Sequence, residues 1–218
     1  HFAKGPGGEP PCVLVHGSGE KVERTLESQG VFPERSNGVL DVEGEEQRRL
    51  VERAVREVNQ EIVAALTDEV VSTVGIQGVD RGLLGRDESG ALVAQNAGWI
   101  ATLVKQRVLP VVSALVEEER VEEVWAADVA VALADALRDD FDPVACALTT
   151  NDRAGLSEDG GIRAEAPLDA VTEEDVPNRE AIHRLHAAGL PVLLTSLQGL
   201  FDDEGPRGTR IAAAEASA

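Results

Sequence analysis

Several residue types are scarce or missing. The chain of 218 residues has no methionine and no tyrosine, and aromatic residues make up 3% of it. Its two cysteines, Cys12 and Cys146, stand alone in apolar runs, which gives neither a disulfide framework nor a metal-binding pattern and predicts buried, reduced thiols. No apolar run approaches the ~18 residues of a membrane span, and no signal peptide is visible. We therefore expect a soluble, cytoplasmic protein. Because position 1 is not methionine, we also expect that residues precede His1 in the natural protein.

Positive charge is scarce as well. Twenty Lys and Arg stand against 40 Asp and Glu, for a formal net charge of −20, and only Lys4, Lys21 and Lys105 are lysines. Such a surface repels nucleic acid and anionic membranes, so neither is an expected partner. Acid-rich, lysine-poor surfaces suit proteins that stay soluble in concentrated salt, which screens their self-repulsion. We therefore expect a halophilic protein.

Apolar runs of strand length alternate with longer amphipathic stretches. The clearest helix covers residues 45–66, where apolar residues recur at spacings of three and four. Further helices are predicted at residues 20–29, 99–107, 128–137 and 178–188. Strands are predicted at residues 12–15, 70–76, 109–113, 144–149 and 191–195, with a last edge strand at 209–211. Residues 31–42 are expected to form a hairpin or an irregular loop, and 117–123 a solvated hairpin. This alternation predicts an α/β fold with a mostly parallel sheet covered on both faces.

In such sheets, ligands bind beyond the carboxyl ends of the strands. Residues 17–19, 75–78 and 149–155 are expected at that edge. Gly17, Ser18 and Gly19 lie between a predicted strand and a predicted helix, where free backbone N–H groups bind phosphate or carboxylate. A tight turn that simply needs glycine explains the same residues, and this fragment alone favours that explanation.

The remaining histidines and tryptophans predict structural roles. His16 lies at a strand end, where a hydrogen-bonding role is more common than catalysis. His183 and His186 are three residues apart on a predicted helix, but no third ligand stands nearby, so no metal site is expected. Trp99 and Trp125 are expected to anchor packing.

Four segments follow one another along the chain. LVHGSGE is a glycine-rich turn after a strand, and SNGVLDVEGEE is an Asn-Gly loop that leads into the long helix containing Asn59. VLPVVSALV is followed by WAADVAVALADAL, the helix that carries Asp128. LTTNDRAGL and the terminal GTRI complete the series. In this order and spacing they resemble the amino acid kinase family, most closely its N-acetylglutamate kinase branch, over nearly the whole chain.

The resemblance implies a three-layer αβα sandwich with a mainly parallel central sheet. It implies one domain over residues 1–218, with an acyl-amino-acid-binding half to about residue 115 and a nucleotide-binding half from about residue 116. The implied activity is transfer of the γ-phosphate of ATP to the side-chain carboxylate of an N-acylated glutamate, in arginine biosynthesis, with ATP and Mg²⁺ as cofactors. Because the family often pairs its subunits through sheet-flanking helices, a homodimer or higher homo-oligomer is expected.

The same resemblance implies the site residues. Phosphoryl transfer needs positioning and positive charge more than covalent help. The substrate-binding residues are Gly17, Ser18, Gly19 and Gly38; the catalytic residues are Gly17 and Asp128; the nucleotide-binding residues are Thr149, Thr150, Asn151, Asp152 and Arg179. Asp128 would organise the catalytic cations, although an ordinary first-turn acid at a helix start is the alternative. For residues 149–152 the alternative is a plain polar turn.

The family's two lysines are not matched. Its first strand ends in lysine-x-glycine-glycine, but no apolar strand precedes Lys4 here, so we expect that strand to lie before His1. Near the start of a late helix, Arg179 stands where the family has its second lysine. Arginine keeps the charge but lacks the compact ammonium geometry.

Other family positions also differ. Leu40 stands where the family has an arginine for the substrate carboxylate, and Arg35 is nearby but displaced along the sequence. Val124 and Ala126 replace two family asparagines. A non-catalytic relative that binds a nucleotide or an acyl amino acid as a sensor or regulator is therefore the alternative function. A kinase for another carboxylate or phosphate is a third possibility.

Overall fold

The computed structural model describes residues 12–36, 38–150, 152–158, 160–200, 202 and 204–212. The described residues form two compact units, one within Pro10–Asp140 and one within Phe141–Ala218, here called the N-terminal and C-terminal units. The boundary between these units follows Asp140, whereas the two functional halves expected from the sequence meet near residue 115. Those functional halves stay a prediction.

The N-terminal unit is built on a parallel sheet of three strands. β7 (Leu109–Ser113) lies between β1 (Leu14–His16) and β4 (Thr73–Gln77). All five residues of β7 are buried, as expected for an apolar strand with helices on both faces. The register pairs His16 with Ser113 and Gln77 with Ser113, so the three strands end at the same level. The carboxyl edge expected from the sequence is thereby formed.

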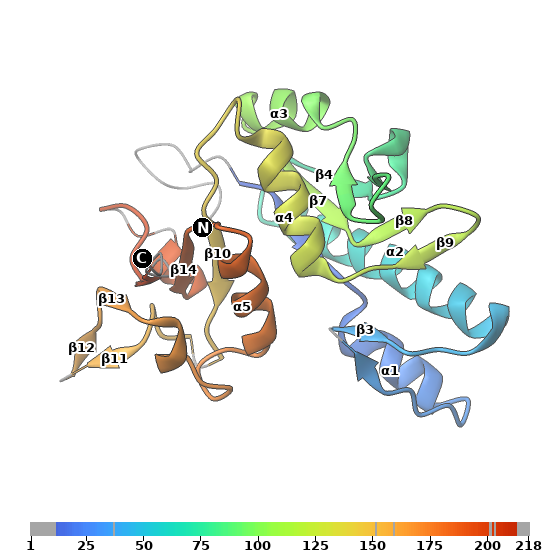
Figure 1. Cartoon of the computed structure of the whole chain (residues 1–218), viewed down its shortest axis with the longest axis horizontal. Coiled ribbons are helices and arrows are strands. Elements are labelled where there is room, and N and C mark those ends of the chain that lie inside the picture. The colour runs from blue at the N-terminus through green and yellow to red at the C-terminus, as the bar shows by residue number, and fades with distance from the viewer. Residues whose placement is uncertain are drawn as a thin grey trace. The chain divides into compact units, whose positions relative to one another are not determined.

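Helices cover both faces of this sheet (Figure 1). α2 (Gly44–Asp68) packs against β4 and β7, while α3 (Gly98–Lys105) packs against β7 and α4 (Ala126–Leu137) against β1. α1 (Gly19–Glu27) packs against α2, and the two share a core of Val22, Leu26, Leu40, Val51, Ala54, Val55 and Leu115. This core explains the apolar spacing seen in residues 45–66. Ion pairs four residues apart, such as Arg49 with Glu45, line the exposed side of α2 and add a few tenths of a kcal/mol each.

Three hairpins and a short helix complete the N-terminal unit. The hairpins join β2 (Arg35–Ser36) to β3 (Val39–Leu40), β5 (Leu84–Arg86) to β6 (Leu92–Ala94), and β8 (Leu115–Glu117) to β9 (Val121–Glu123). The short 3-10 helix is η1 (Asp80–Gly82). The hairpins predicted within residues 31–42 and 117–123 are therefore confirmed as hairpins.

The C-terminal unit holds a mixed sheet of four strands in the order β10-β14-β15-β13. β10 (Ala145–Leu148) runs parallel to β14 (Val192–Thr195), β15 (Thr209–Ile211) runs antiparallel to β14, and β13 (Glu165–Ala166) is parallel to β15. α5 (Arg179–Ala187) packs against β14 and is capped by Asn178, whose Oδ1 accepts from the Ala181 N–H at 3.0 Å. The remaining elements are β11 (Ser157–Glu158), β12 (Gly161–Ile162), η2 (Leu168–Ala170) and α6 (Leu197–Leu200).

Three expectations are wrong in detail. The strand expected from residue 70 begins at Thr73, because Val70 has a φ of 63° and belongs to the turn after α2. The strand at residues 209–211 is internal rather than an edge, because β13 pairs with its outer side. Cys146 is exposed rather than buried and Cys12 is half-buried. Cys146 and Leu148 lie on the exposed face of β10, which alternates with its half-buried face.

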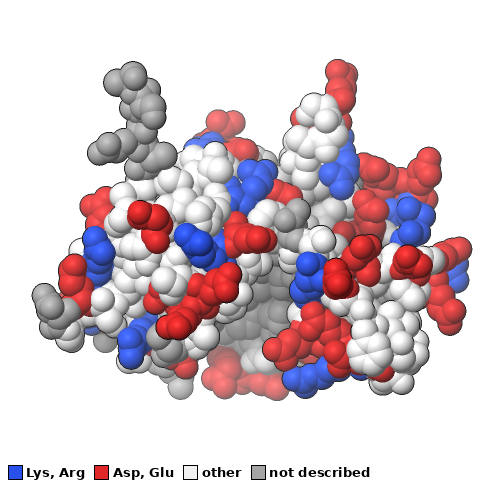
Figure 2. Space-filling model, turned by 60° about the horizontal axis from the view of Figure 1, so that its bottom comes forward, with Lys and Arg blue, Asp and Glu red and all other residues white. Residues whose placement is uncertain are grey.

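The surface follows the composition. Acidic side chains are spread over the face shown in Figure 2, with smaller basic groups between them. None of the helices in the described ranges combines the length and apolarity needed to cross a bilayer.

Candidate functional site

The glycine turn, residues 17–19, connects β1 to α1. Gly19 has a φ of 60°, in the left-handed region that favours glycine, so the tight-turn explanation accounts for this residue. Gly17 is small for another reason. A Cβ on Gly17 would lie 2.9 Å from Glu123 Oε1, closer than real side chains come. The turn therefore leaves room for a carboxylate, and that carboxylate belongs to the chain itself.

Glu123, the last residue of β9, is directed at this turn. The Ser18 N–H donates to Glu123 Oε1 at 2.5 Å, and Ser18 is 1% exposed. Burial raises the pKa of Glu123, although its contacts with Ser18 and the charge of Arg35 favour the ionised form. Within the described chain, Glu123 Oε2 and Ser18 Oγ are buried without a hydrogen-bond partner. The hairpin expected to be solvated is thus turned inward at its end, because β9 continues into the buried Val124.

Arg35 connects the glycine turn to the loop that contains Gly38. Its Nη2 donates to Gly19 O at 2.8 Å and its Nη1 donates to Gly38 O at 2.6 Å, while its Nε pairs with Glu23 at 2.5 Å. The sequence places Arg35 off the family's arginine position, but the fold brings its guanidinium to the glycine turn. It thereby joins Gly19 to Gly38, two of the predicted substrate-binding residues. Asn37 lies outside the described residues.

His16 and Asn59 form a chain of hydrogen bonds that ends at the glycine turn. Asn59 is 2% exposed, and its Nδ2 lies 2.9 Å from His16 Nε2 and donates to Val111 O at 2.9 Å. His16 Nδ1 lies 2.9 Å from Gly17 O, so the neutral ring donates from Nδ1 and accepts at Nε2. Burial lowers the pKa of His16. The predicted hydrogen-bonding role of His16 is confirmed.

Gly75 lies in the middle of β4, and Gly78 follows the carboxyl end of this strand. A Cβ on Gly78 would lie 2.1 Å from Leu115 O, so this glycine permits close packing of two backbones. The Gly78 N–H donates to Ser113 O at 3.1 Å, and Ser113 Oγ donates to Gln77 Oε1 at 2.8 Å. Gln77 and Gly78 are therefore on the same edge of the sheet as residues 17–19, whereas Gly75, predicted at this edge, lies within β4 and pairs with Val111.

Asp128 lies in the first turn of α4 and is half-buried. Its backbone N–H donates to Trp125 O at 3.0 Å, and α4 packs against β1. Its place at a helix start is confirmed. Its role with cations stays a prediction.

In the C-terminal unit, the predicted nucleotide loop follows β10. The Thr149 N–H donates to Thr195 O at 2.9 Å, and the Thr150 N–H donates to Asp175 O at 2.9 Å. Asp152 has a φ of 55°, a turn conformation, and Asn151 lies outside the described residues. The loop is thus fixed to the end of β14 and to the segment just before α5.

Arg179 is the first residue of α5, four positions after Asp175. Its Nε is buried without a hydrogen-bond partner, and none of the ion pairs among the described residues includes it. A positively charged side chain that lacks a partner and begins a helix can neutralise an anionic ligand. Lys4 lies outside the described residues.

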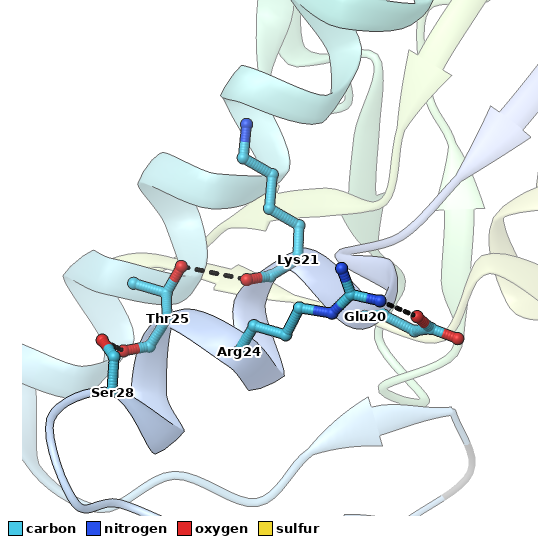
Figure 3. Close-up of a pocket in the computed structure, with 5 residues that line it drawn as sticks. All are labelled: Glu20, Lys21, Arg24, Thr25 and Ser28. Atoms are coloured by element: carbon cyan, nitrogen blue, oxygen red, sulfur yellow. Dashed lines mark hydrogen bonds and ion pairs between the residues drawn. The ribbon is translucent and has the colours of Figure 1, made fainter.

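A shallow pocket of about 410 Å³ lies on the outer side of α1 (Figure 3), lined by Glu20, Lys21, Arg24, Thr25 and Ser28. Both of its cations are paired, because Lys21 contacts Glu57 and Glu61 of α2 and Arg24 contacts Glu20. The pocket therefore offers no unpaired charge to a ligand.

No group of three or more His, Cys, Asp or Glu side chains converges to hold a metal ion in the part of the chain that the structure describes. His183 and His186 lie on α5, and His186 Nε2 lies 2.7 Å from Ala212 O, which ties the helix to the end of β15.

Curated relatives are acetylglutamate kinases. The protein of Methanopyrus kandleri is 28% identical over 224 residues, which cover 88% of this chain and 89% of that protein. The protein of Deinococcus radiodurans is 34% identical over 139 residues, which cover 60% of this chain and 54% of that protein. The chain therefore aligns with most of one relative and with about half of the other.

Solved structures share the fold. A protein of Streptococcus mutans UA159 superposes with a TM-score of 0.63 at 21% identity, covering 92% of this chain and 85% of that one. An isopentenyl phosphate kinase superposes with a TM-score of 0.56 at 17% identity, covering 92% and 83%. At these identities the likeness shows the α/β sandwich fold alone.

The family assignment rests on the sequence. The model of the amino acid kinase family matches residues 4–140, more than half of the chain, and these residues include the glycine turn, the long helix α2 and Asp128. The chain therefore belongs to the amino acid kinase family, a family of phosphotransferases.

Proposed function

We propose that the chain transfers the γ-phosphate of ATP to the side-chain carboxylate of an N-acylated glutamate, as an acetylglutamate kinase of arginine biosynthesis. An oxygen of the acceptor carboxylate attacks the γ-phosphorus, the bond to the ADP oxygen breaks, and an acyl phosphate and ADP are formed. The observation that carries the proposal is the Arg35 guanidinium held at the glycine turn by Gly19 and Gly38, in a chain whose curated relatives are acetylglutamate kinases.

The N-terminal unit would bind the acceptor. Gly17, Ser18, Gly19 and Gly38 supply short backbone segments that a ligand can approach closely. Three of the five N–H groups of Arg35 are used by Glu23, Gly19 and Gly38, so the two remaining N–H groups on its Nη atoms would donate to the acceptor carboxylate. Arg35 would therefore serve in place of the arginine that Leu40 replaces.

The C-terminal unit would bind the nucleotide through Thr149, Thr150, Asn151, Asp152 and Arg179. Arg179, whose Nε lacks a hydrogen-bond partner among the described residues, would neutralise phosphate charge, which is the main task in phosphoryl transfer. Bound Mg²⁺ would neutralise the nucleotide phosphates, and Asp128 is the carboxylate proposed to organise the cations.

Two observations favour the alternative, a non-catalytic relative that binds a nucleotide or an acyl amino acid as a sensor or regulator. The Ser18 N–H already donates a hydrogen bond to the carboxylate of Glu123. In addition, Val124 and Ala126 replace the two family asparagines. A kinase for a phosphate acceptor, like the isopentenyl phosphate kinase of the same fold, is a third candidate.

Trapping of the acyl phosphate tests the proposal. The protein from the full gene is incubated in high KCl with Mg-ATP, hydroxylamine and either N-acetylglutamate or N-succinylglutamate. Hydroxamate above the no-enzyme control is expected. Its absence would contradict the proposal. Binding of ATP or acylglutamate without hydroxamate would support the sensor, and ADP release with isopentenyl phosphate would support the third candidate.

A further inference from the structure

Glu123 occupies a position that the glycine turn would otherwise offer to a ligand. The Ser18 N–H is one of the free amides at the start of α1, and such amides bind anions. Here its hydrogen bond goes to Glu123 Oε1 at 2.5 Å, across 105 positions of sequence. The missing Cβ of Gly17 is what lets this oxygen approach.

The fold fixes Glu123 in this place. Its backbone pairs with Leu115 of β8, which is fully buried, and the next residue, Val124, donates its N–H to Ala114 O at 2.9 Å. The carboxylate is therefore held at the turn by both strands of its hairpin and by the buried segment that follows.

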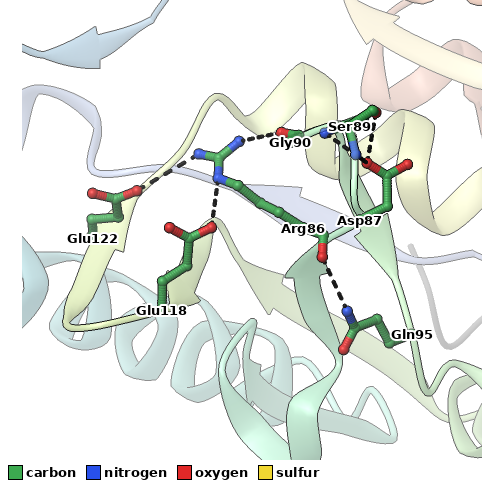
Figure 4. A network of polar contacts seen from close by, with 8 residues as sticks. Arg86, Asp87, Ser89, Gly90, Gln95, Glu118 and Glu122 are labelled. Carbon is green, nitrogen blue, oxygen red and sulfur yellow. Dashed lines mark hydrogen bonds and ion pairs between the residues drawn. The ribbon is translucent and has the colours of Figure 1, made fainter.

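A second hairpin braces the first (Figure 4). Arg86 of β5 lies 3.1 Å from Glu118 and 3.6 Å from Glu122, and its Nη1 also donates to Gly90 O at 3.1 Å. Arg86 thus joins the β5–β6 hairpin to both ends of the β8–β9 turn. Glu122, next to Glu123, takes part in this network while Glu123 does not.

The unpaired atoms indicate what the turn still lacks. Glu123 Oε2 and Ser18 Oγ are buried without a partner in the described chain. A carboxylate oxygen can only accept a hydrogen bond while it is ionised, so a donor satisfies it and a second anion does not. An anion placed on the Ser18 N–H would also face the charge of Glu123 at short range in a partly buried site.

We propose that Glu123 is a specificity-determining residue of the glycine turn: it withholds the Ser18 N–H from anionic groups and favours a neutral group that donates a hydrogen bond. The raised pKa of Glu123, caused by burial, agrees with an acid that lacks full compensation. The inference rests on the proposed function and refines it, because it predicts that the acceptor carboxylate does not bind at the Ser18 N–H of the wild-type protein.

Two acyl amino acids that differ only in the side-chain group test this proposal. N-acetylglutamate ends in a carboxylate and N-acetylglutamine in a neutral amide that donates. Their dissociation constants are measured by calorimetry for the wild-type protein, Glu123→Gln and Glu119→Gln. Glu119 lies at the exposed tip of the same hairpin, so its variant removes the same charge away from the turn. Inorganic phosphate is a third probe, independent of the acyl amino acid.

Glu123→Gln is expected to bind N-acetylglutamate and phosphate about tenfold more tightly, because the neutral amide removes the repulsion that the carboxylate exerts on an anion at the turn. N-acetylglutamine should bind no more tightly, and Glu119→Gln should resemble the wild type. Equal or weaker anion binding by Glu123→Gln would overturn the inference, as would failure of all three proteins to bind any anion.

The experiment distinguishes failure of the proposed function from failure of this inference. If no protein makes hydroxamate but Glu123→Gln gains phosphate affinity, the inference stands and the kinase proposal falls. Should Glu123→Gln fail to fold, Arg86→Gln provides the second test. It weakens the brace on the hairpin, and a smaller gain in phosphate affinity is expected; no gain would overturn the inference.

Discussion

The Asn59 side chain joins α2 to the end of β1 through His16, with 2.9 Å between Asn59 Nδ2 and His16 Nε2. Because His16 Nδ1 lies 2.9 Å from Gly17 O, the contact continues into the glycine turn. A buried polar side chain is stable only with its partners in place. Asn59 therefore fixes both the tautomer of His16 and the start of the proposed acceptor site.

Asn59→Ala should destabilise the protein. The change removes the donor to the buried His16 Nε2 and to Val111 O, at a cost of about 1–3 kcal/mol. In a protein of this size that lowers Tm by roughly 2–4 °C per kcal/mol. Urea denaturation measures the loss, and Gln60→Ala, at the exposed neighbouring position, is the control. Equal stability of the two variants would show that the Asn59 contacts contribute nothing.

Local patterns predicted the elements well and their long-range contacts poorly. β7 has the bounds that its apolar run predicts, and α2 extends the predicted helix by a few residues. Both predictions rest on the spacing of apolar residues within a single segment, so they do not depend on contacts with distant parts of the chain. Glu123 was expected to be solvated, since nothing within residues 117–123 shows that a turn 105 positions earlier takes its carboxylate. The same limit applies to Arg35, whose contact with Gly19 depends on how α1 packs. The internal place of β15 depends on β13, a pair of residues with no strong pattern.

Asp128→Asn should abolish turnover while leaving the fold intact. If Asp128 organises the catalytic cations, the neutral amide removes their anchor, and the loss in kcat should be at least about 100-fold. Circular dichroism should be unchanged, because the substitution keeps the size of the side chain. The matched control is Asp135→Asn on the same helix, where the acid is exposed and forms an ion pair with Arg138. Turnover equal to that of Asp135→Asn would exclude the proposed role.

Molar KCl should stabilise the protein. Acidic side chains are spread over the face in Figure 2, and the net charge of −20 opposes the compact state through self-repulsion. Between about 0.1 M and about 3 M KCl the Debye length falls from about 10 Å to below 3 Å, so Tm should rise by roughly 5–10 °C. Sucrose at the same osmolarity is the control, since it is excluded from the surface but screens no charge. A flat or falling Tm in KCl would contradict the halophile prediction.

Glu123→Gln should raise stability at neutral pH, and the gain should vanish in acid. Burial raises the pKa of Glu123 above its ordinary value of 4.5, so the folded state holds this proton more tightly than the unfolded state does. The contribution of Glu123 is then fully present below pH 4.5 and is lost as pH rises through the folded pKa. Glutamine has no charge to bury, so the variant should melt at a higher temperature than the wild type at pH 7.5, with Glu119→Gln as control.

The comparison of the two pH values separates two accounts of the Ser18 contact. If the hydrogen bond from the Ser18 N–H outweighed the cost of burying the carboxylate, Glu123→Gln would be less stable at pH 7.5 than at pH 4.5, relative to the wild type. That outcome would make the ionised Glu123 a stabilising cap of α1. A gain at pH 7.5 that disappears at pH 4.5 instead means that the carboxylate is kept at the glycine turn at a cost in stability, as expected for a residue that acts on ligands.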